Sequence, residues 1–413
     1  MSRIASVRVT PIALKDPPLL NASGVHEPYA LRSVIEIECA AGAVGLSETY
    51  GDADTLERLQ AVAPHLRSHG THDLQALAQT IRTHAVRSAQ GPSARAFDKV
   101  FAAFETGLAD LNARRAGVPL CEWLGGRVRD RVPYSAYLFY KFGRHHGAPY
   151  EDDAWSEALD GSAIVAQAQR MVSQYGFGSL KLKAGVFEPV QEARALLALH
   201  EAFPKHPLRI DPNGNWSLAT ALRVAAAVGS TLEYFEDPVP TLADMAHLQH
   251  ETGLMLATNM VVVDRREFAA NAALGFPIKT ILCDHHAWPG FRATHELAAL
   301  CETFGLRLSM HSNSHAGISL MAMTHLAATI PELAYACDTH YPWQSEDVIA
   351  GGRVPFVDGA VRVGDAPGLG VTLDRDALAA LHEQYLRCGI RGRDDEREMR
   401  KHRPDFVKRK PRY

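Results

Sequence analysis

The sequence predicts an α/β fold in which a TIM-type barrel follows a smaller α+β domain. From residue 132 onward, eight short apolar runs alternate with amphipathic stretches, which is the pattern of a parallel β/α barrel. Before that point strands and helices do not alternate, as expected of a separate α+β domain. The 413 residues, 46% of them hydrophobic, are enough for two cores.

The first domain is expected to cover residues 1–125, because the strand signals there are followed by helical periodicity. Apolar and polar residues alternate in VIEIE, and Gly117 is placed to end the longer helix. The predicted strands are residues 4–14 and 33–51 with a hairpin turn near 41–42, and the predicted helices are residues 53–67 and 94–115.

The barrel is expected to follow over residues 126–375. A doubly wound open sheet is the alternative, and it is disfavoured because no glycine-rich phosphate turn follows the first strand. The eight predicted strands are residues 132–141, 179–185, 208–214, 231–238, 254–260, 280–286, 306–312 and 333–339.

Composition excludes several classes of protein. The net charge of −4 gives no basic field for nucleic acid. None of the six cysteines forms a C-x-x-C pair, so no zinc site or disulfide framework is indicated. No apolar run is long enough to cross a bilayer, and the first residues lack a leader pattern. A cytoplasmic enzyme that acts on a small molecule is therefore expected, with the charged tail beyond Arg393 as a solvated, partly docked terminus.

Polar residues close the predicted barrel strands one after another. In a barrel the carboxyl ends of the strands form the rim where active sites are built. Any one of these residues alone would be an ordinary loop-start cap, but together they indicate a site. They are Lys181 and Lys183, Asp211 and Asn213, Glu236 and Asp237, Asn259, Asp284, His311 and His340.

Three of these residues are candidate ligands for a metal ion. Asp211, Glu236 and Asn259 come from three neighbouring strands and offer only oxygen donors. Such hard donors suit Mg²⁺, and Mn²⁺ would also be tolerated. Taken alone, the Asp211-Pro212-Asn213-Gly214 run is equally typical of a simple turn.

Two kinds of base are expected at the same rim. Lys181 and Lys183 are two apart on a strand and share one face, so like-charge repulsion and burial are expected to lower the pKa of one of them. Asp284 behind His311 would fix the imidazole tautomer, although His285, His286 and His315 crowd the region. A lysine, a histidine and a metal-held carboxylate suit removal of an α-proton, followed by loss of a β-hydroxyl as water.

The motifs KLK, DPNG, EDP, ATNM, CDHH and SMHSNSH, in this order, resemble those of the enolase superfamily and, within it, of the glucarate dehydratases. The likeness extends to LLNASGVHEPYALR, SAYLFYK, DTHYPWQ and GIRGRDD. It implies a modified (β/α)7β barrel with an α+β capping domain, against which residues 376–413 pack back. The implied activity is the dehydration of D-glucarate, with L-idarate as a further candidate substrate, to 5-dehydro-4-deoxy-D-glucarate. Lys183 and His311 on opposite faces would also permit epimerisation at the carbon they flank.

The resemblance also implies roles for individual residues. Lys183 would be one base and His311, backed by Asp284, the other, with Lys181 and Asn313 assisting at the carboxylate and the enediolate. The residues implied to contact the diacid and its hydroxyls are Asn21, His26, Tyr137, His340 and Arg393.

Three departures from the glucarate dehydratase pattern leave alternatives open. Ala102 aligns with a substrate-contacting threonine, the tail diverges after GRDD, and EDP lacks the insertion associated with the second metal carboxylate. Glu236 is therefore the candidate ligand, with Asp237 as the alternative. The alternatives are a weakly active paralogue, or a dehydratase or epimerase for another aldarate or aldonate.

Two further expectations complete the prediction. A metal-dependent amidohydrolase on the same barrel is disfavoured, because the first strand ends Leu138-Phe139-Tyr140-Lys141 without the H-x-H that this chemistry needs. A symmetric homo-oligomer is the default for such enzymes.

Overall fold

The computed structural model describes residues 2–85, 95–147, 150 and 153–413. Its N-terminal part is an antiparallel sheet of order β1-β4-β5, with β1 (Ile4–Lys15), β4 (Tyr29–Cys39) and β5 (Val44–Tyr50). The chain turns between β4 and β5 at Gly42, whose φ is +81°, which confirms the predicted hairpin. Two short strands, β2 (Leu20–Asn21) and β3 (Gly24–Val25), pair in the loop that precedes β4.

Helices pack against one face of this sheet. Ile35 and Ile37 of the sheet share an apolar core with Phe104 and Leu108 of α3. The prediction missed α2, and position 94, the first of the longer predicted helix, lies outside the described residues. Gly117 ends α3 in the left-handed conformation, as predicted. The helices are α1 (Ala53–Val62), continued by η1 (Ala63–Leu66), α2 (Leu74–His84), α3 (Ala96–Ala116) and the short α4 (Leu120–Trp123).

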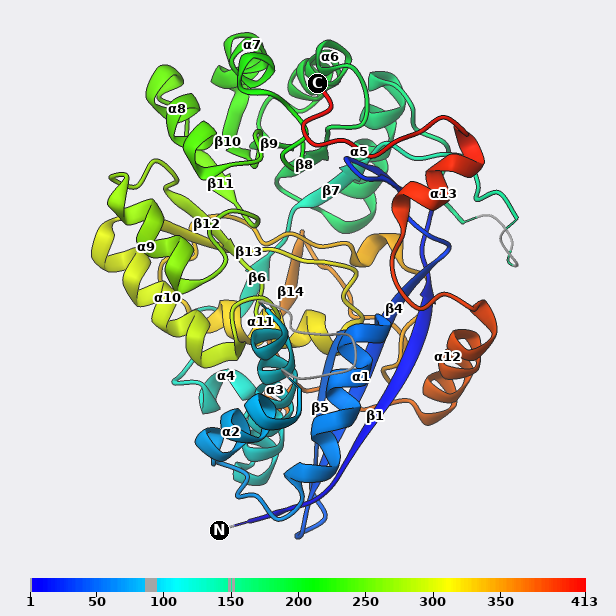
Figure 1. The fold of residues 1–413 in the computed structure, drawn as a ribbon, viewed down its shortest axis with the longest axis vertical. Coiled ribbons are helices and arrows are strands. Elements are labelled where there is room, and N and C mark those ends of the chain that lie inside the picture. The colour runs from blue at the N-terminus through cyan, green and yellow to red at the C-terminus, as the bar shows by residue number, and fades with distance from the viewer. Residues whose placement is uncertain (1, 86–94, 148–149, 151–152) are drawn as a thin grey trace.

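A curled parallel sheet of seven strands, in the order β7 to β13, forms the second part and confirms the predicted fold class (Figure 1). Its strands are β7 (Ala136–Phe139), β8 (Leu180–Lys183), β9 (Leu208–Asp211), β10 (Leu232–Glu236), β11 (Leu256–Thr258), β12 (Thr280–Cys283) and β13 (Arg307–Met310). The helices between and after them are α5 (Gly161–Tyr175), α6 (Pro189–Ala202), α7 (Leu218–Val228), η2 (Gly229–Thr231), α8 (Leu242–Thr252), α9 (Arg265–Ala273), α10 (Gly290–Phe304) and α11 (Gly317–Thr329).

The predicted eighth strand, residues 333–339, is not a regular strand. It makes single parallel bridges from Leu333 to Leu308 and from Cys337 to Tyr134. The Asp338 N–H donates to Met310 O at 2.9 Å, and the Cys337 N–H donates to Pro133 O at 2.8 Å. The segment therefore lies between the last and first strands and closes the barrel with few hydrogen bonds, as expected of a (β/α)7β arrangement.

The predicted first barrel strand, residues 132–141, is divided in two. Its start belongs to β6 (Arg131–Pro133), which pairs antiparallel with β14 (Ala360–Arg362). Only β7 enters the parallel sheet, because the chain has already paired with a segment more than 200 residues later. The segment is largely apolar through both pieces, so its pattern could not reveal the change of partner.

The last part of the chain returns to the N-terminal sheet. Helix α12 (Arg375–Cys388) lies along β1, and α13 (Asp395–His402) lies against β3 (Figure 1). His382 and Gln384 bond the carbonyl oxygens of Pro11 and Ala13 on β1. A 3-10 turn, η3 (Tyr341–Trp343), precedes this part. The predicted division at residues 125 and 375 stays a prediction, since these contacts do not define domain limits.

The tail beyond α13 is docked more firmly than predicted. Lys410 Nζ donates to Asn213 O at 2.8 Å, and Tyr413 OH donates to Val186 O at 3.1 Å. These bonds hold the tail against loops that follow β8 and β9. Over the part of the chain that the structure describes, no helix combines the length and apolar character that a bilayer crossing requires.

Candidate active site

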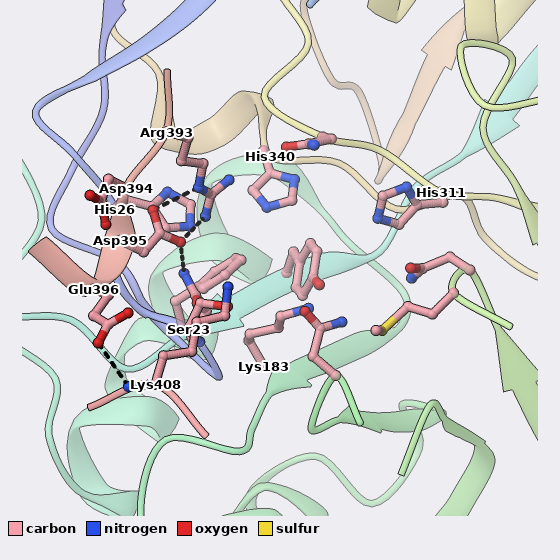
Figure 2. A pocket seen from close by; sticks show the side chains of 17 residues that line it. Ser23, His26, Lys183, His311, His340, Arg393, Asp394, Asp395, Glu396 and Lys408 are labelled. Carbon is pink, nitrogen blue, oxygen red and sulfur yellow. Dashed lines mark hydrogen bonds and ion pairs between the residues drawn. The ribbon is translucent and has the colours of Figure 1, made fainter. Parts of the chain in front are cut away.

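The predicted rim residues surround one cavity of about 410 Å³ at the carboxyl ends of the barrel strands. Figure 2 shows Lys183 and His311 in this cavity, with Arg393, Asp395 and His26 toward its other end. The predicted residues that line it are Asn21, His26, Tyr137, Lys183, Asn213, Asn259, His311, Asn313, His340 and Arg393. Lys181, Asp211, Glu236 and Asp284 are buried and reach the lining residues through the contacts described below.

A buried charge cluster lies beneath Lys183. Its Nζ donates to Asp211 Oδ2 at 2.5 Å, and Lys181 Nζ pairs with Glu236 Oε2 at 2.5 Å and with Asp338 Oδ2 at 2.6 Å. Lys181 also reaches Asp211 Oδ2 at 3.7 Å, which shows that the two lysines share one face, as predicted. These side chains come from adjacent strands, so the alternation within β8 and the parallel register bring them together.

The charges of this cluster set its pKa values. Burial alone would lower the pKa of Lys181, but Asp338, Glu236 and Asp211 hold it well above its usual range. The expectation that repulsion between the lysines lowers a pKa is therefore wrong for Lys181, because the carboxylates around it outnumber its one ammonium neighbour. Burial likewise opposes the ionisation of Asp211, yet Lys183 and Lys181 lower its pKa.

The candidate metal ligands lie together at this cluster. Burial and the nearby Asp211 raise the pKa of Glu236 well above its usual range, so a cation beside the two carboxylates would be favourable. The Asn259 amide nitrogen donates to Glu236 Oε1 at 2.5 Å, which places the third donor beside the second. Two carboxylates and an amide oxygen are a donor set that fits Mg²⁺.

Both carboxylate oxygens of Asp237, the alternative ligand, accept hydrogen bonds within the protein. Its Oδ1 accepts from Thr258 Oγ1 at 2.5 Å, and its Oδ2 accepts from the Asn259 N–H at 2.9 Å. Burial, with repulsion from Asp211, raises its pKa to about 7. Both of its oxygens hold the turn that carries Asn259, which leaves Glu236 as the carboxylate of this pair that faces the cluster.

The histidine side of the cavity is arranged differently. Asp284 Oδ2 lies 3.5 Å from His311 Nδ1 and accepts from Tyr50 OH at 3.3 Å. Its Oδ1 lies 2.8 Å from His286 Nδ1. Burial alone would raise the pKa of Asp284, but His286, His311 and His315 hold it well below its usual range. The predicted dyad of Asp284 and His311 therefore has the geometry of a carboxylate behind an imidazole.

The other end of the cavity carries the predicted substrate-binding residues. His26 Nδ1 bonds Asp16 Oδ2 at 3.0 Å, and the His26 ring stacks on that of His340 with centroids 6.4 Å apart. Burial lowers the pKa of His340 well below its usual range, and the nearby basic side chains, among them Lys183 and Arg393, add to this effect. A neutral His340 imidazole can both donate to and accept from a hydroxyl group.

Arg393 is already engaged by the protein. Its Nε and Nη2 donate to the two oxygens of Asp395, each at 2.7 Å, and Asn21 Nδ2 donates to Asp395 Oδ2 at 2.8 Å. The bidentate face of Arg393, a residue implied to contact the diacid, is therefore occupied by Asp395. Only Nη1 and the second hydrogen on Nη2 are left for a ligand.

Several residues of the site were missed from the sequence. Asp338 lies near the carboxyl end of residues 333–339, the predicted eighth strand. The search for polar residues at strand ends, which selected His340, could therefore have found it. Tyr50 and Glu48 on β5, and Arg32 on β4, gave no comparable signal, because their contacts span more than 200 residues. Ala102, where a substrate-contacting threonine was expected, is fully buried in α3 and does not line the cavity.

The sequence and the fold are both similar to those of known enzymes. Residues 163–377, more than half of the chain, match the family described as enolase C-terminal domain-like. The chain is 47% identical, over 98% of its length and 97% of the other's, to a probable glucarate dehydratase of Streptomyces coelicolor.

Two solved structures extend the likeness to the whole fold. An enolase from Pseudomonas fluorescens, solved with magnesium, potassium and tartrate, is 52% identical with a TM-score of 0.97 and covers 100% of this chain and 99% of its own. An enolase from Thermobispora bispora, solved with magnesium and formate, is 50% identical with a TM-score of 0.96 over 100% of both chains. The chain described here therefore belongs to the enolase superfamily.

Proposed function

We propose that this protein is an acid-sugar dehydratase that converts D-glucarate, and its epimer L-idarate, to 5-dehydro-4-deoxy-D-glucarate. The observation that carries the proposal is that Lys183 and His311 line one cavity together with polar side chains that could bond the hydroxyl groups of a substrate. A probable glucarate dehydratase at 47% identity supports the substrate class. A relative at 52% identity that binds tartrate, a hydroxylated dicarboxylate, supports it as well.

In this mechanism Lys183 and His311 exchange protons with the substrate. The α-carbon gives its proton to whichever of the two bases faces it, and the electron pair left behind spreads into the neighbouring carboxylate as an enediolate. His311, when it carries a proton, donates it to the β-hydroxyl group, and the carbon–oxygen bond breaks with release of water. The resulting enol becomes the keto acid.

The other residues prepare the cavity for these steps. Lys181 is held as an ammonium group by three carboxylates, so it supplies fixed positive charge near the developing enediolate and is not the base. Asn313 and the neutral His340 would bond the carboxylate and hydroxyl groups of the substrate. When Mg²⁺ is bound by Asp211, Glu236 and Asn259, it would supply positive charge that holds the substrate carboxylate and favours its enediolate form.

The test is to incubate the purified protein with Mg²⁺ and a panel of aldarates and aldonates. Keto acid formation and exchange of the α-proton for deuterium are followed by NMR. Dehydration of D-glucarate is expected, as is loss of activity in EDTA that Mg²⁺ or Mn²⁺ restores. If no acid sugar in the panel loses water or exchanges its α-proton, the proposal is wrong.

One observation favours a second candidate, a dehydratase or epimerase for a monocarboxylic sugar acid. Because Asp395 occupies the fork of Arg393, the far end of the cavity has less capacity to bind a second carboxylate. Faster turnover of an aldonate than of the corresponding aldarate would support this candidate over glucarate.

A further inference from the structure

His286 is a buried side chain in the turn after β12 that the proposed mechanism does not use. Its Nδ1 lies 2.8 Å from Asp284 Oδ1, and its backbone N–H donates to the same oxygen at 2.9 Å. Because an ionised carboxylate only accepts hydrogen bonds, Nδ1 must carry the hydrogen. Asp284 Oδ1 is thus fixed by two donors, and Oδ2 is left to face His311 Nδ1 at 3.5 Å.

The other edge of the His286 ring is fixed as well. With the ring hydrogen on Nδ1, Nε2 can accept from Ser319 Oγ at 3.1 Å, and it lies 2.9 Å from the Glu48 carbonyl oxygen. Glu48 is itself immobilised, because its carboxylate accepts from Arg32 Nε at 2.6 Å and from the Ser319 N–H at 2.9 Å. The ring therefore connects β5 of the N-terminal sheet and α11 of the barrel to the carboxylate behind His311.

From this geometry we infer that His286 is a positioning residue for His311, which holds the Asp284 carboxylate at the rotation that presents Oδ2 to the His311 imidazole. This inference rests on the proposed function, since it assigns a role within that reaction. A carboxylate free to rotate would lose its hold on the His311 tautomer and ring orientation, and small displacements of a reacting group cost large factors in rate.

The neighbouring histidines show that burial alone does not give this role. His285 and His315 are as buried as His286. Within the described part of the chain, none of the four ring nitrogens of these two residues has a hydrogen-bond partner. They crowd Asp284 without bonding it, whereas His286 bonds it directly.

Three substitutions separate the two edges of the ring. His286→Asn keeps an amide nitrogen where Nδ1 bonds Asp284, His286→Gln keeps one where Nε2 faces Glu48, and His286→Leu keeps neither. The readout is α-deuterium exchange, in the presence of Mg²⁺, of D-glucarate and L-idarate, which present the α-proton to opposite bases. We expect His286→Leu and His286→Gln to slow the exchange that depends on His311 by about 10- to 100-fold, with the exchange that depends on Lys183 changed less than about threefold. In His286→Asn, the exchange that depends on His311 should keep most of its wild-type rate.

A matched control is His325→Asn, which changes another fully buried histidine whose Nδ1 accepts from the Cys121 N–H at 3.2 Å far from the cavity. It should lower the melting temperature without favouring either epimer. Equal slowing of both epimers by His286→Leu, or equal activity of the Asn and Gln variants, would overturn the inference. If the wild type exchanges neither epimer, the proposed function fails first, and that result is distinct from a wild type that exchanges both.

Discussion

The two sides of the cavity are built in different ways. On the lysine side, Lys181, Lys183, Asp211 and Glu236 come from three consecutive barrel strands, and their contacts are ion pairs with each other and with Asp338. On the histidine side, Asp284 and His311 come from two consecutive strands, but their support comes from β5 of the N-terminal sheet. The barrel alone therefore holds the lysine side in place. The histidine side depends on contacts between the barrel and the N-terminal sheet.

This difference predicts which substitutions should disturb each side of the cavity. The lysine side depends on a local balance of buried charges, so removal of one charge should disturb both stability and catalysis. The histidine side depends on hydrogen bonds that cross between parts of the fold, so a change outside the barrel should alter one base and spare the other.

The sharpest test of the comparison is to remove each base in turn. Lys183→Met should slow α-deuterium exchange of the epimer whose proton faces Lys183 by about 10² to 10⁴-fold, and His311→Asn should do the same for the other epimer, because each loses its general base. NMR exchange rates for both epimers measure the effect. Similar losses for both epimers in both variants would mean that the two sides do not act separately.

Next in size is the effect of Asp338→Asn on stability. Lys181 is fully buried and loses one of its two closest carboxylates, so we expect the free energy of unfolding to fall by about 3 kcal/mol. Denaturant unfolding monitored by circular dichroism gives this value. Glu383→Gln is the control, because it breaks a pair with Arg387 at 3.5 Å in which both side chains are exposed, and it should cost about 1 kcal/mol or less. Equal losses would contradict a special role for the buried cluster.

Glu105 tests the contact between the two parts through pH. This buried residue of α3 accepts from the Phe291 N–H at 2.9 Å in the first turn of α10, and burial raises its pKa to about 7 from the usual 4.5. A raised native pKa gives stability that is complete below the unfolded pKa and is lost as pH rises through about 7.

Glu105→Gln cannot titrate, so the free energy of unfolding of this variant relative to wild type should rise between pH 4.5 and pH 8. The rise should be up to about 3 kcal/mol. Unfolding curves of both proteins across this range measure the difference. A difference that does not vary with pH would show that the pKa of Glu105 is not raised in the folded state.

The smallest expected effect belongs to Tyr50→Phe. It removes one hydrogen bond of 3.3 Å to Asp284 Oδ2, and a bond of this kind contributes about 1 kcal/mol. Exchange that depends on His311 should slow by less than about tenfold, with the other epimer unaffected. Tyr134→Phe is the control, because its hydroxyl bonds Thr324 Oγ1 at 2.7 Å away from the cavity. It should show no preference between epimers.

The fold could be predicted well where neighbouring residues carry the signal. Alternating strands and helices indicated the barrel, and each strand-end residue from Lys183 to His311 could be assigned to the rim. The prediction was less accurate at residues 132–141 and 333–339, because an apolar run has the same pattern whether it pairs with one partner or changes partners. A lowered pKa was expected for one of the two lysines, and Lys181 is not that lysine, because the carboxylates around it include Asp338, more than 150 residues away.

The sequence by itself determined the barrel and the rim position of the lysines, the candidate metal ligands and the histidine with its aspartate. It could do so because a parallel sheet brings the carboxyl ends of all its strands to one edge, whatever their distance along the chain. Only the tertiary structure decided that Asp395 forms a bidentate ion pair with Arg393 and that Asp237 bonds the turn that carries Asn259. It also decided that Glu48 and Tyr50 support the histidine side. Such contacts join segments with no shared periodicity, so only the packing of the two parts against each other brings their atoms within bonding distance.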